Sequence, residues 1–234
     1  MRSNEARAGT SLVEVLAVMT LTGLLLTLVV GVCRAQLRLA RATAERAVRS
    51  DAVRTAGVVL AGEARRMTRA DVRALSDDSI AVRAFRGMGI PCEAWAGGIV
   101  VRYSGDRLPD PAKDSVLVIG TAITSALVLL DSRPATASCP ALAGENVLQW
   151  RLSGSPPAAS VILVFESGSY HLSDRALRYR IGAAGRQPLT GEALYDAGSR
   201  FISIDDHALR FDIAVDEIRT AAHIAYFATR GPPP

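Results

Sequence analysis

The fold of this chain is decided by the stretch Ala8-Gly9-Thr10-Ser11-Leu12-Val13-Glu14-Val15-Leu16 and by the apolar run that it opens. No charged residue occurs from Val15 to Cys33. At about 1.5 Å of rise per residue, a helix of that length crosses the ~30 Å hydrocarbon core of a bilayer. The run therefore predicts a membrane span.

Glu14 is the one acidic residue in the first turn of this predicted span. An ionised side chain that faces lipid costs on the order of 2.5–3.5 kcal/mol on insertion scales, so Glu14 needs a partner or a function. The residues Ser11-Leu12-Val13-Glu14 also fit a capping box, in which the serine caps the first amides of a helix and the glutamate reaches back. The two interpretations are compatible.

The N-terminal pattern resembles the cleavage and methylation signal of type IV prepilins and pseudopilins. It has a short basic leader that ends in glycine, a polar-apolar start, and a glutamate at the fifth position of an apolar helix. The resemblance implies that a prepilin peptidase cuts between Gly9 and Thr10 and methylates the new amine of Thr10. It also implies that Glu14 pairs with the N-terminal amine of a neighbouring subunit. Thr10 departs from the family pattern, in which Phe or Met is usual at this position.

Other N-terminal signals compete with this interpretation. Arg2 and Arg7 would form the basic region of a secretory signal peptide, but the apolar run exceeds the usual ~7–15 residues and no good small-x-small cleavage site follows it. A lipoprotein-type cut before Cys33 is disfavoured because Val32 stands where a small residue is expected. An uncleaved signal anchor stays open as an alternative.

The positive charge of the chain is concentrated near the predicted span. The whole chain carries a net charge of +4, but residues 1–73 hold twelve arginines against six acids, and residues 74–234 hold fifteen basic against seventeen acidic residues. Arg34, Arg38 and Arg41 fall on one helical stripe, where they could meet anionic headgroups or acids of neighbouring subunits. We expect no nucleic-acid face on the folded domain.

Charge alone does not fix the membrane topology. The arginines that follow the span compete with Arg2 and Arg7 under the positive-inside rule. The resemblance implies a single-pass inner-membrane protein with a cytoplasmic N-terminus and a periplasmic C-terminal domain, which enters a filament after assembly.

The chain divides into four predicted parts: a leader at 1–9, the membrane half of a long helix at 10–33, an amphipathic stem helix at 34–70, and an antiparallel β domain at 71–234. The helix is expected to continue through the stem because no proline precedes Pro91 and the stem is rich in Ala, Arg, Leu and Glu. Its apolar stripe is expected to pack on the chain's own domain in its distal half. The stripe consists of Leu37, Ala44, Val48, Ala52, Ala56, Val59, Leu60, Glu63 and Met67.

The β domain is predicted from a change to shorter patterns after Asp71. Residues 177–181 and 209–215 alternate apolar with polar, as half-buried strands do. Continuous apolar runs at 116–119, 126–130, 161–165 and 223–227 predict strands covered on both faces. Turn signals lie at 167–169, 173–175, 182–185 and 205–207.

The expected fold is α+β and pilin-like, with a long N-terminal helix packed on a mainly antiparallel domain. Its size and class fit the larger minor pseudopilins.

The three cysteines receive different interpretations. Cys33, at the end of the span, is expected to be a small apolar residue. Cys92 and Cys139 both lie in sequence typical of loops, and a disulfide between them is reasonable if the domain lies outside the cytoplasm. It would close a loop of 47 residues and contribute roughly 3–4 kcal/mol in the chain-entropy model. Neither spacing resembles a zinc site or a redox motif.

Signs of catalytic chemistry are weak throughout the chain. His171, His207 and His223 are isolated, and the acidic pairs Asp77-Asp78 and Asp205-Asp206 are typical of turns. There is no nucleophile elbow, phosphate-binding glycine loop or paired metal-binding histidine motif. We therefore expect no enzyme activity, no metal and no cofactor.

The resemblance implies a structural role. It suggests a minor pseudopilin, of the J-type of type II secretion, or a related minor type IV pilin. The implied partners are the prepilin peptidase, other pseudopilins or pilins, the inner-membrane assembly platform and membrane lipid. The alternative from another class is a signal-anchored envelope protein whose β domain binds a ligand or partner without entering a filament.

Overall fold

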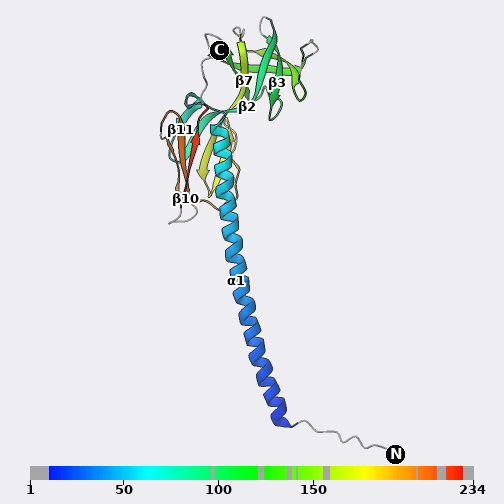
Figure 1. The fold of residues 1–234 in the computed structure, drawn as a ribbon, viewed down its shortest axis with the longest axis vertical. Helices are drawn as coiled ribbons and strands as arrows, with labels where there is room; N and C mark the ends of the chain where they lie inside the picture. Colours follow the sequence, from blue (N-terminus) through cyan, green and yellow to red (C-terminus); the bar gives the residue numbers. More distant parts are fainter. Residues whose placement is uncertain are drawn as a thin grey trace, which may run out of the picture. The chain divides into compact units, whose positions relative to one another are not determined.

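The computed structural model describes residues 11–95, 98–120, 124–135, 139–140, 142–154, 159–203, 205–214 and 220–228. The predicted leader and Thr10 lie outside these ranges. The chain divides into two compact units, residues 1–48 and residues 49–234. A single long helix, α1, runs from Leu12 to Ala64, and antiparallel strands make up most of the second unit (Figure 1). The predicted α+β class is confirmed at this level.

Helix α1 ends at Ala64, six residues before the predicted end of the stem. A new short 3-10 helix, η1, follows at Arg69–Asp71. Asp71 Oδ2 accepts hydrogen bonds from the backbone N–H and from the hydroxyl of Thr68, both at 2.8 Å. This reciprocal cap starts a separate helical turn, which explains why good helix-forming residues do not extend α1 to residue 70.

The larger sheet contains nine strands among the described residues, in the order β1-β2-β3-β6-β5-β4-β7-β8-β9, with every neighbouring pair antiparallel. Their bounds are β1 (Val72–Leu75), β2 (Ser79–Trp95), β3 (Gly98–Gly105), β4 (Asp114–Gly120), β5 (Thr124–Pro134), β6 (Asn146–Leu152), β7 (Ala159–Ser173), β8 (Ala176–Ile181) and β9 (Gln187–Pro188).

Six of these strands close into a small barrel. Strand β2 pairs with β7 as well as with β3, so the ring β2-β3-β6-β5-β4-β7 returns to β2. Trp150 and Tyr103 fill the interior and meet edge to face, with ring centroids 5.8 Å apart. Closure removes free strand edges, and side chains fill a barrel of this size. In Figure 1 the labelled strands β3 and β7 lie at the opposite end of the domain from β10 and β11.

Strands β2 and β7 continue beyond the barrel into an open sheet. There β2 also pairs with β1, and β7 pairs with β8. A second, three-stranded sheet contains β10 (Tyr195–Ser203), β11 (Ala208–Ala214) and β12 (Thr220–Tyr226). The last turns of α1 share one hydrophobic core with both sheets, which includes Leu60 of α1, Leu172 of β7 and Phe211 of β11.

Several strand predictions hold and others need correction. The runs at 116–119, 161–165 and 177–181 lie in β4, β7 and β8, and 209–214 lies in β11, while Val215 is outside the described residues. The predicted turn at 167–169 is wrong, because these residues pair inside β7. Gly168 permits this, since a Cβ there would overlap the Tyr179 hydroxyl. The turn at 173–175 is present, with Asp174 and Arg175 at positive φ.

Two apolar runs are not covered on both faces as predicted. Residues 126–130 lie in β5 on the wall of the barrel, so alternate side chains face outward and Val128 is 51% exposed. Residues 223–226 lie in β12, where Ile224 and Tyr226 are exposed on one face. Both strands cover a core on one side only, and continuous apolar sequence does not distinguish this from full burial.

Candidate functional site

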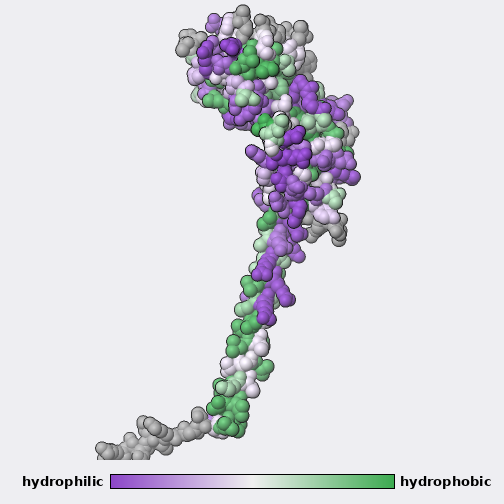
Figure 2. All heavy atoms as spheres, turned by 180° about the vertical axis from the view of Figure 1, so that it is seen from behind, coloured by the Kyte–Doolittle hydropathy of each residue, from purple (hydrophilic) through white to green (hydrophobic). Residues whose placement is uncertain are grey.

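The first unit presents a continuous apolar surface that no described residue covers. An 18-residue window of α1 has a mean hydropathy of 2.5, and none of it is buried. Figure 2 shows hydrophobic residues along the visible face of this end of the helix. The exposed large side chains are Leu12, Val13, Val15, Leu16, Val18, Met19, Leu21, Leu24, Leu25, Leu26, Leu28, Val29, Val30 and Val32. A surface of this extent marks a membrane or protein contact, so the helix is a candidate membrane span.

The polar groups within this segment are satisfied inside the helix. The hydroxyl of Thr20 donates to the carbonyl oxygens of Leu16 and Ala17 at 3.0 and 2.9 Å, and those of Thr22 and Thr27 donate to backbone carbonyls at 2.7 and 2.8 Å. A segment in hydrocarbon must satisfy its polar groups internally. The threonines therefore do not prevent α1 from crossing a bilayer.

Glu14 serves as a helix cap in the isolated chain. The backbone N–H of Ser11 donates to Glu14 Oε2 at 3.2 Å, and the N–H of Val13 donates to Ser11 Oγ at 3.3 Å. Ser11 and Glu14 are both exposed. Glu14 thus reaches back as in the capping box that the sequence allowed, while Ser11 Oγ caps the amide of Val13 and not that of Glu14. Glu14 remains accessible to a second partner. Gly9 and Thr10, the expected cleavage residues, lie outside the described residues.

The arginines that follow the apolar segment have no ion-pair partner in the part of the chain that the structure describes. Arg34, Arg38 and Arg41 are exposed, and none of them forms an ion pair with a described carboxylate. Further along α1, Arg54 pairs with Asp51 at 3.0 Å. The stripe of Arg34, Arg38 and Arg41 is therefore available to anionic groups outside the chain.

The distal part of the apolar stripe packs on the chain's own domain, as predicted. Ala52, Ala56 and Leu60 are buried, whereas Leu37 and Val48 are exposed. Gly57 lies so close to β12 that a Cβ there would be 2.8 Å from Cε1 of His223. The His223 ring therefore packs directly against the helix backbone at this point.

A buried charge network fixes the last turn of α1 to the larger sheet. Arg86 of β2 donates to Glu166 of β7 through Nε at 2.8 Å and to Glu63 of α1 through Nη1 at 3.2 Å. Arg107 extends the network by contacting Asp114 through Nη1 at 2.6 Å and Glu166 through Nη2 at 2.9 Å. The three carboxylates are all buried, and each has an arginine partner.

The network favours the charged forms of Arg86 and Glu166 in spite of burial. Burial acts to lower the pKa of Arg86, but the charges of Glu63 and Glu166 outweigh it and the pKa is raised. Burial acts to raise the pKa of Glu166, but the charge of Arg86 and hydrogen bonds from Tyr179 and Arg86 outweigh it, so the pKa is lowered. Removing one member would leave an uncompensated buried charge. This arrangement suits a rigid attachment of the helix and not proton transfer.

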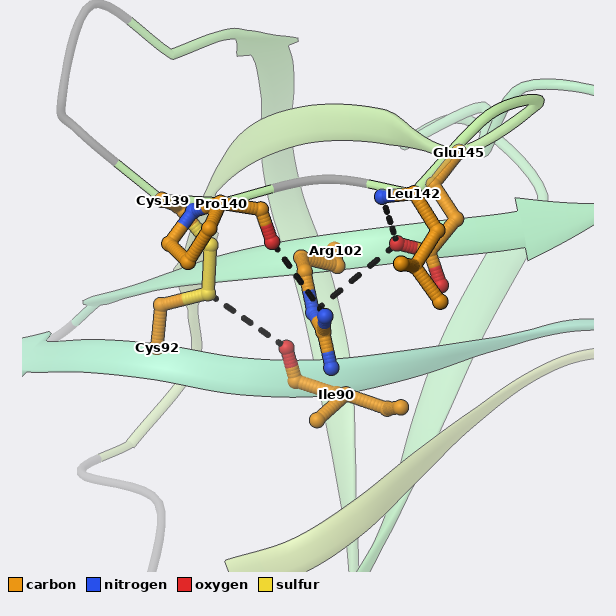
Figure 3. Close-up of a disulfide and its surroundings, with 7 residues drawn as sticks. All are labelled: Ile90, Cys92, Arg102, Cys139, Pro140, Leu142 and Glu145. Carbon is orange, nitrogen blue, oxygen red and sulfur yellow. Dashed lines mark hydrogen bonds and ion pairs between the residues drawn. A yellow bond between two sulfur atoms is a disulfide. The ribbon is translucent and has the colours of Figure 1, made fainter.

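Cys92 and Cys139, the pair expected from the sequence, are joined by a disulfide with their Cα atoms 6.0 Å apart (Figure 3). Cys92 lies within β2 and not in a loop, contrary to the prediction. Arg102 of β3 holds the segment next to Cys139, since its Nη1 donates to the Pro140 carbonyl at 3.2 Å and its Nε lies 3.9 Å from Glu145 Oε2. The bond attaches the segment before β6 to the barrel wall. Cys33 is free and exposed.

The histidines and acidic turns form no metal centre in the part of the chain that the structure describes. His171, His207 and His223 lie in β7, a turn and β12, as expected. Asp205 Oδ1 accepts the backbone N–H groups of His207 and Ala208, both at 2.7 Å, so this carboxylate stabilises the turn. The acidic turn therefore has a structural explanation.

The network residues are what sequence reasoning missed. Glu166 directly follows a buried apolar run, and Arg86 lies in the middle of a long strand. A charged residue inside an apolar strand pattern is the signal that could have identified them. The chain matches no protein-family model, no curated protein and no solved structure.

Proposed function

We propose that this chain is a pilin-like structural subunit, either a minor pseudopilin of the J-type of type II secretion or a related minor type IV pilin. The observation that carries the proposal is the uncovered apolar surface of α1 from Leu12 to Val32, on a helix whose last turns are buried in a β domain. Such a helix needs lipid before assembly and other helices after it, because water cannot accommodate an apolar surface of this extent.

Glu14 is the residue we assign to assembly. Cleavage between Gly9 and Thr10 would place a new amine four residues before this carboxylate, and a neighbouring subunit would present the same amine. Glu14 is exposed and, among the described residues, accepts a single 3.2 Å bond from its own Ser11 N–H, so it can pair with a charge from another chain. Such a pair in low dielectric mainly specifies register, since leaving either charge alone in lipid is costly.

The proposed location follows from the same features. The helix spans the inner membrane once, with the N-terminus in the cytoplasm and the β domain in the periplasm. The disulfide between Cys92 and Cys139 supports this topology, since such bonds persist outside the cytoplasm. The proposed partners are the prepilin peptidase, other pseudopilins or pilins, the inner-membrane assembly platform and membrane lipid.

The second candidate is a signal-anchored envelope protein whose β domain binds a partner outside any filament. The hydrogen bond between Glu14 and the Ser11 amide favours it, because this bond accounts for the glutamate within one chain. The two candidates differ in processing and in their dependence on Glu14.

The decisive experiment is the intact mass and N-terminal sequence of the protein taken from membranes of its own host. A chain that begins at Thr10, methylated or not, supports the pilin-like proposal. A chain that retains residues 1–9 contradicts it and favours the signal anchor. A Gly9→Val variant should block a cut after residue 9 and leave α1 unchanged. Gly23→Ala is its matched control and should be processed like the native chain.

A further inference from the structure

One face of the paired strands β7 and β8 gathers polar and basic side chains. Ser169 lies directly opposite Arg180 in this pair, and His171 lies opposite Arg178. Opposed residues on one face have Cβ atoms about 4.5–5.5 Å apart, and diagonal neighbours lie about 7–8 Å apart, within reach of long side chains. His171 and Arg180 are diagonal neighbours. The other face of the same strands carries Tyr170 and Tyr179, which join the network at α1.

Three atoms on this polar face have hydrogen-bonding capacity that no described residue uses. The Ser169 hydroxyl lies 2.8 Å from His171 Nε2. When this hydroxyl donates, the ring carries its hydrogen on Nδ1. His171 is only 6% exposed, and its Nδ1 has no partner among the described residues. The atoms Arg180 Nε and Ser173 Oγ are also buried, and they too have no partner among the described residues. A buried donor without an acceptor costs about 1–3 kcal/mol, so three of them point to a missing acceptor.

The positive charge on this face is only partly compensated. Within the described residues, Arg180 and Arg186 form no ion pair, whereas Arg178 lies 3.3 Å from both Asp174 and Glu192. Burial lowers the pKa of His171, the charges of Arg186 and Arg180 lower it further, and Asp78 opposes them. The Asp78 Oδ1 accepts a hydrogen bond from the Ser76 hydroxyl at 2.7 Å, which lowers the pKa of Asp78 and favours its charged form. The two arginines therefore outnumber the one carboxylate that acts on the ring, and a net positive charge remains for a ligand.

We propose that this face binds a tetrahedral oxyanion of the phosphate class. Its oxygens would accept hydrogen bonds from His171 Nδ1, Arg180 Nε and Ser173 Oγ, with Arg186 as the second positive charge. Three separate donors and two cations fit a divalent tetrahedral anion better than a carboxylate, which has only two oxygens. The role is binding, since His171 Nδ1 contacts no described carboxylate and Ser169 therefore lacks the third member of a catalytic triad. The inference does not depend on the proposed function.

The test uses the full chain in a nonionic detergent, with inorganic phosphate added at constant ionic strength and chloride as the reference anion. The ring ¹H and ¹⁵N signals of the three histidines report the site. We expect saturable shifts of His171, with His207 and His223 unchanged. Arg180→Gln should weaken binding at least about tenfold, which corresponds to about 1.4 kcal/mol. Arg151→Gln is the matched control, because Arg151 is exposed on β6 and forms no ion pair with a described residue.

A second experiment distinguishes a free phosphate ion from the phosphate of a lipid headgroup. The chain is placed in phosphatidylcholine bilayers with and without phosphatidylglycerol, and the same histidine signals are recorded. A response to inorganic phosphate identifies a site for the free anion, and a response to phosphatidylglycerol alone identifies a lipid headgroup site. The proposal is overturned if neither addition moves the His171 signals saturably, or if Arg180→Gln binds as tightly as the native chain.

Discussion

The hydroxyl of Tyr170 donates a 2.6 Å hydrogen bond to Glu63 Oε2 and joins the end of α1 to β7, 107 residues away in sequence. The same carboxylate accepts from Arg86 Nη1 at 3.2 Å. Burial and the charge of Glu63 raise the pKa of Tyr170 well above its ordinary value, so the phenol remains a donor at neutral pH. The attachment of the helix to the sheet is therefore charged and directional as well as apolar.

Replacing Glu63 should destabilise the domain strongly. Glu63→Ala leaves Arg86 with one carboxylate and Tyr170 without an acceptor, and we expect a loss of about 3–5 kcal/mol in the free energy of unfolding. Tyr170→Phe removes only the hydrogen bond and should cost about 1–2 kcal/mol. Urea unfolding followed by circular dichroism measures both. Asp51→Ala, which breaks an exposed pair on the same helix, is the control. A Glu63→Ala loss no larger than that of Asp51→Ala would contradict the prediction.

Two glycines of α1 should respond in opposite directions to alanine. Gly62 has open space where a Cβ would lie, so Gly62→Ala should stabilise the helix by about 1 kcal/mol. In Gly57→Ala the new Cβ would meet the His223 ring at 2.8 Å. The repacking should outweigh the gain in helix propensity and lower the free energy of unfolding by about 1–3 kcal/mol, as in overpacked cores. Thermal unfolding of the two variants provides the comparison. Equal shifts of Tm would show that helix and sheet are not packed closely at Gly57.

Stability should fall as the pH drops from 7.5 to 5. Burial lowers the pKa of both His171 and His223, so the unfolded chain binds these protons more readily than the folded chain. Their contribution is complete above the unfolded pKa of about 6.5 and is lost as the pH falls below it. The lowered pKa of Glu166 adds a second loss below about pH 4.3.

The measurement is the urea midpoint as a function of pH. His223→Gln should reduce the slope between pH 7 and 5. His207→Gln serves as the control, because it replaces a histidine in an exposed turn, apart from the positions of His171 and His223. A native midpoint that stays constant from pH 7.5 to 5 would refute the assignment of these two histidines.

Removing the disulfide should lower the free energy of unfolding by up to about 3–4 kcal/mol, which is the chain-entropy value for a closed loop of 47 residues. The variant is Cys92→Ser with Cys139→Ser, and the bond spans 47 residues. Intact mass should rise by about two daltons on reduction of the native chain, because one bond takes up two hydrogens. Cys33→Ser is the control, since this residue is free and exposed. No mass change on reduction would show that the native protein lacks the bond.

Glu14→Ala should abolish incorporation into a filament and leave the β domain folded. The reason is that the substitution removes the exposed carboxylate assigned to the neighbouring amine, far in sequence from the core that contains Leu60 and Phe211. The readout is the fraction of the protein recovered in sheared surface filaments or cross-linked oligomers of the host. Glu45→Ala, another exposed acid of α1, is the matched control. Unchanged incorporation of Glu14→Ala would remove this residue from the mechanism.

The helix and most strands could be predicted from sequence because their signals are local. The charge-free run after Glu14 and the missing proline before Pro91 fix α1, and the alternation at 177–181 fixes β8. The end of α1 was placed too late, because a single pair, Thr68 and Asp71, starts the next turn. The turn placed at Gly168 was wrong because this glycine makes room for Tyr179 and does not bend the chain.

The closed barrel and the buried network could not be predicted in the same way. Their contacts join residues far apart in sequence, such as Arg86 and Glu166, and no local period encodes such pairs. The same holds for the face of His171, whose neighbours Arg180 and Arg186 come from β8 and the following loop. The sequence pattern alone does not predict that His171, Arg180 and Arg186 lie close together.

Strands β2 and β7 belong to both the barrel and the sheet that holds α1, and they pair with each other over ten positions from Ser79 to Gly89. Neither part of the domain can therefore melt without breaking backbone ladders that the other part uses. We expect one cooperative transition for residues 49–234, in which the barrel and the helix attachment are lost together. A load applied to α1 would likewise be borne by the whole domain, since it passes through Glu63 and Arg86 directly into the two strands that close the barrel.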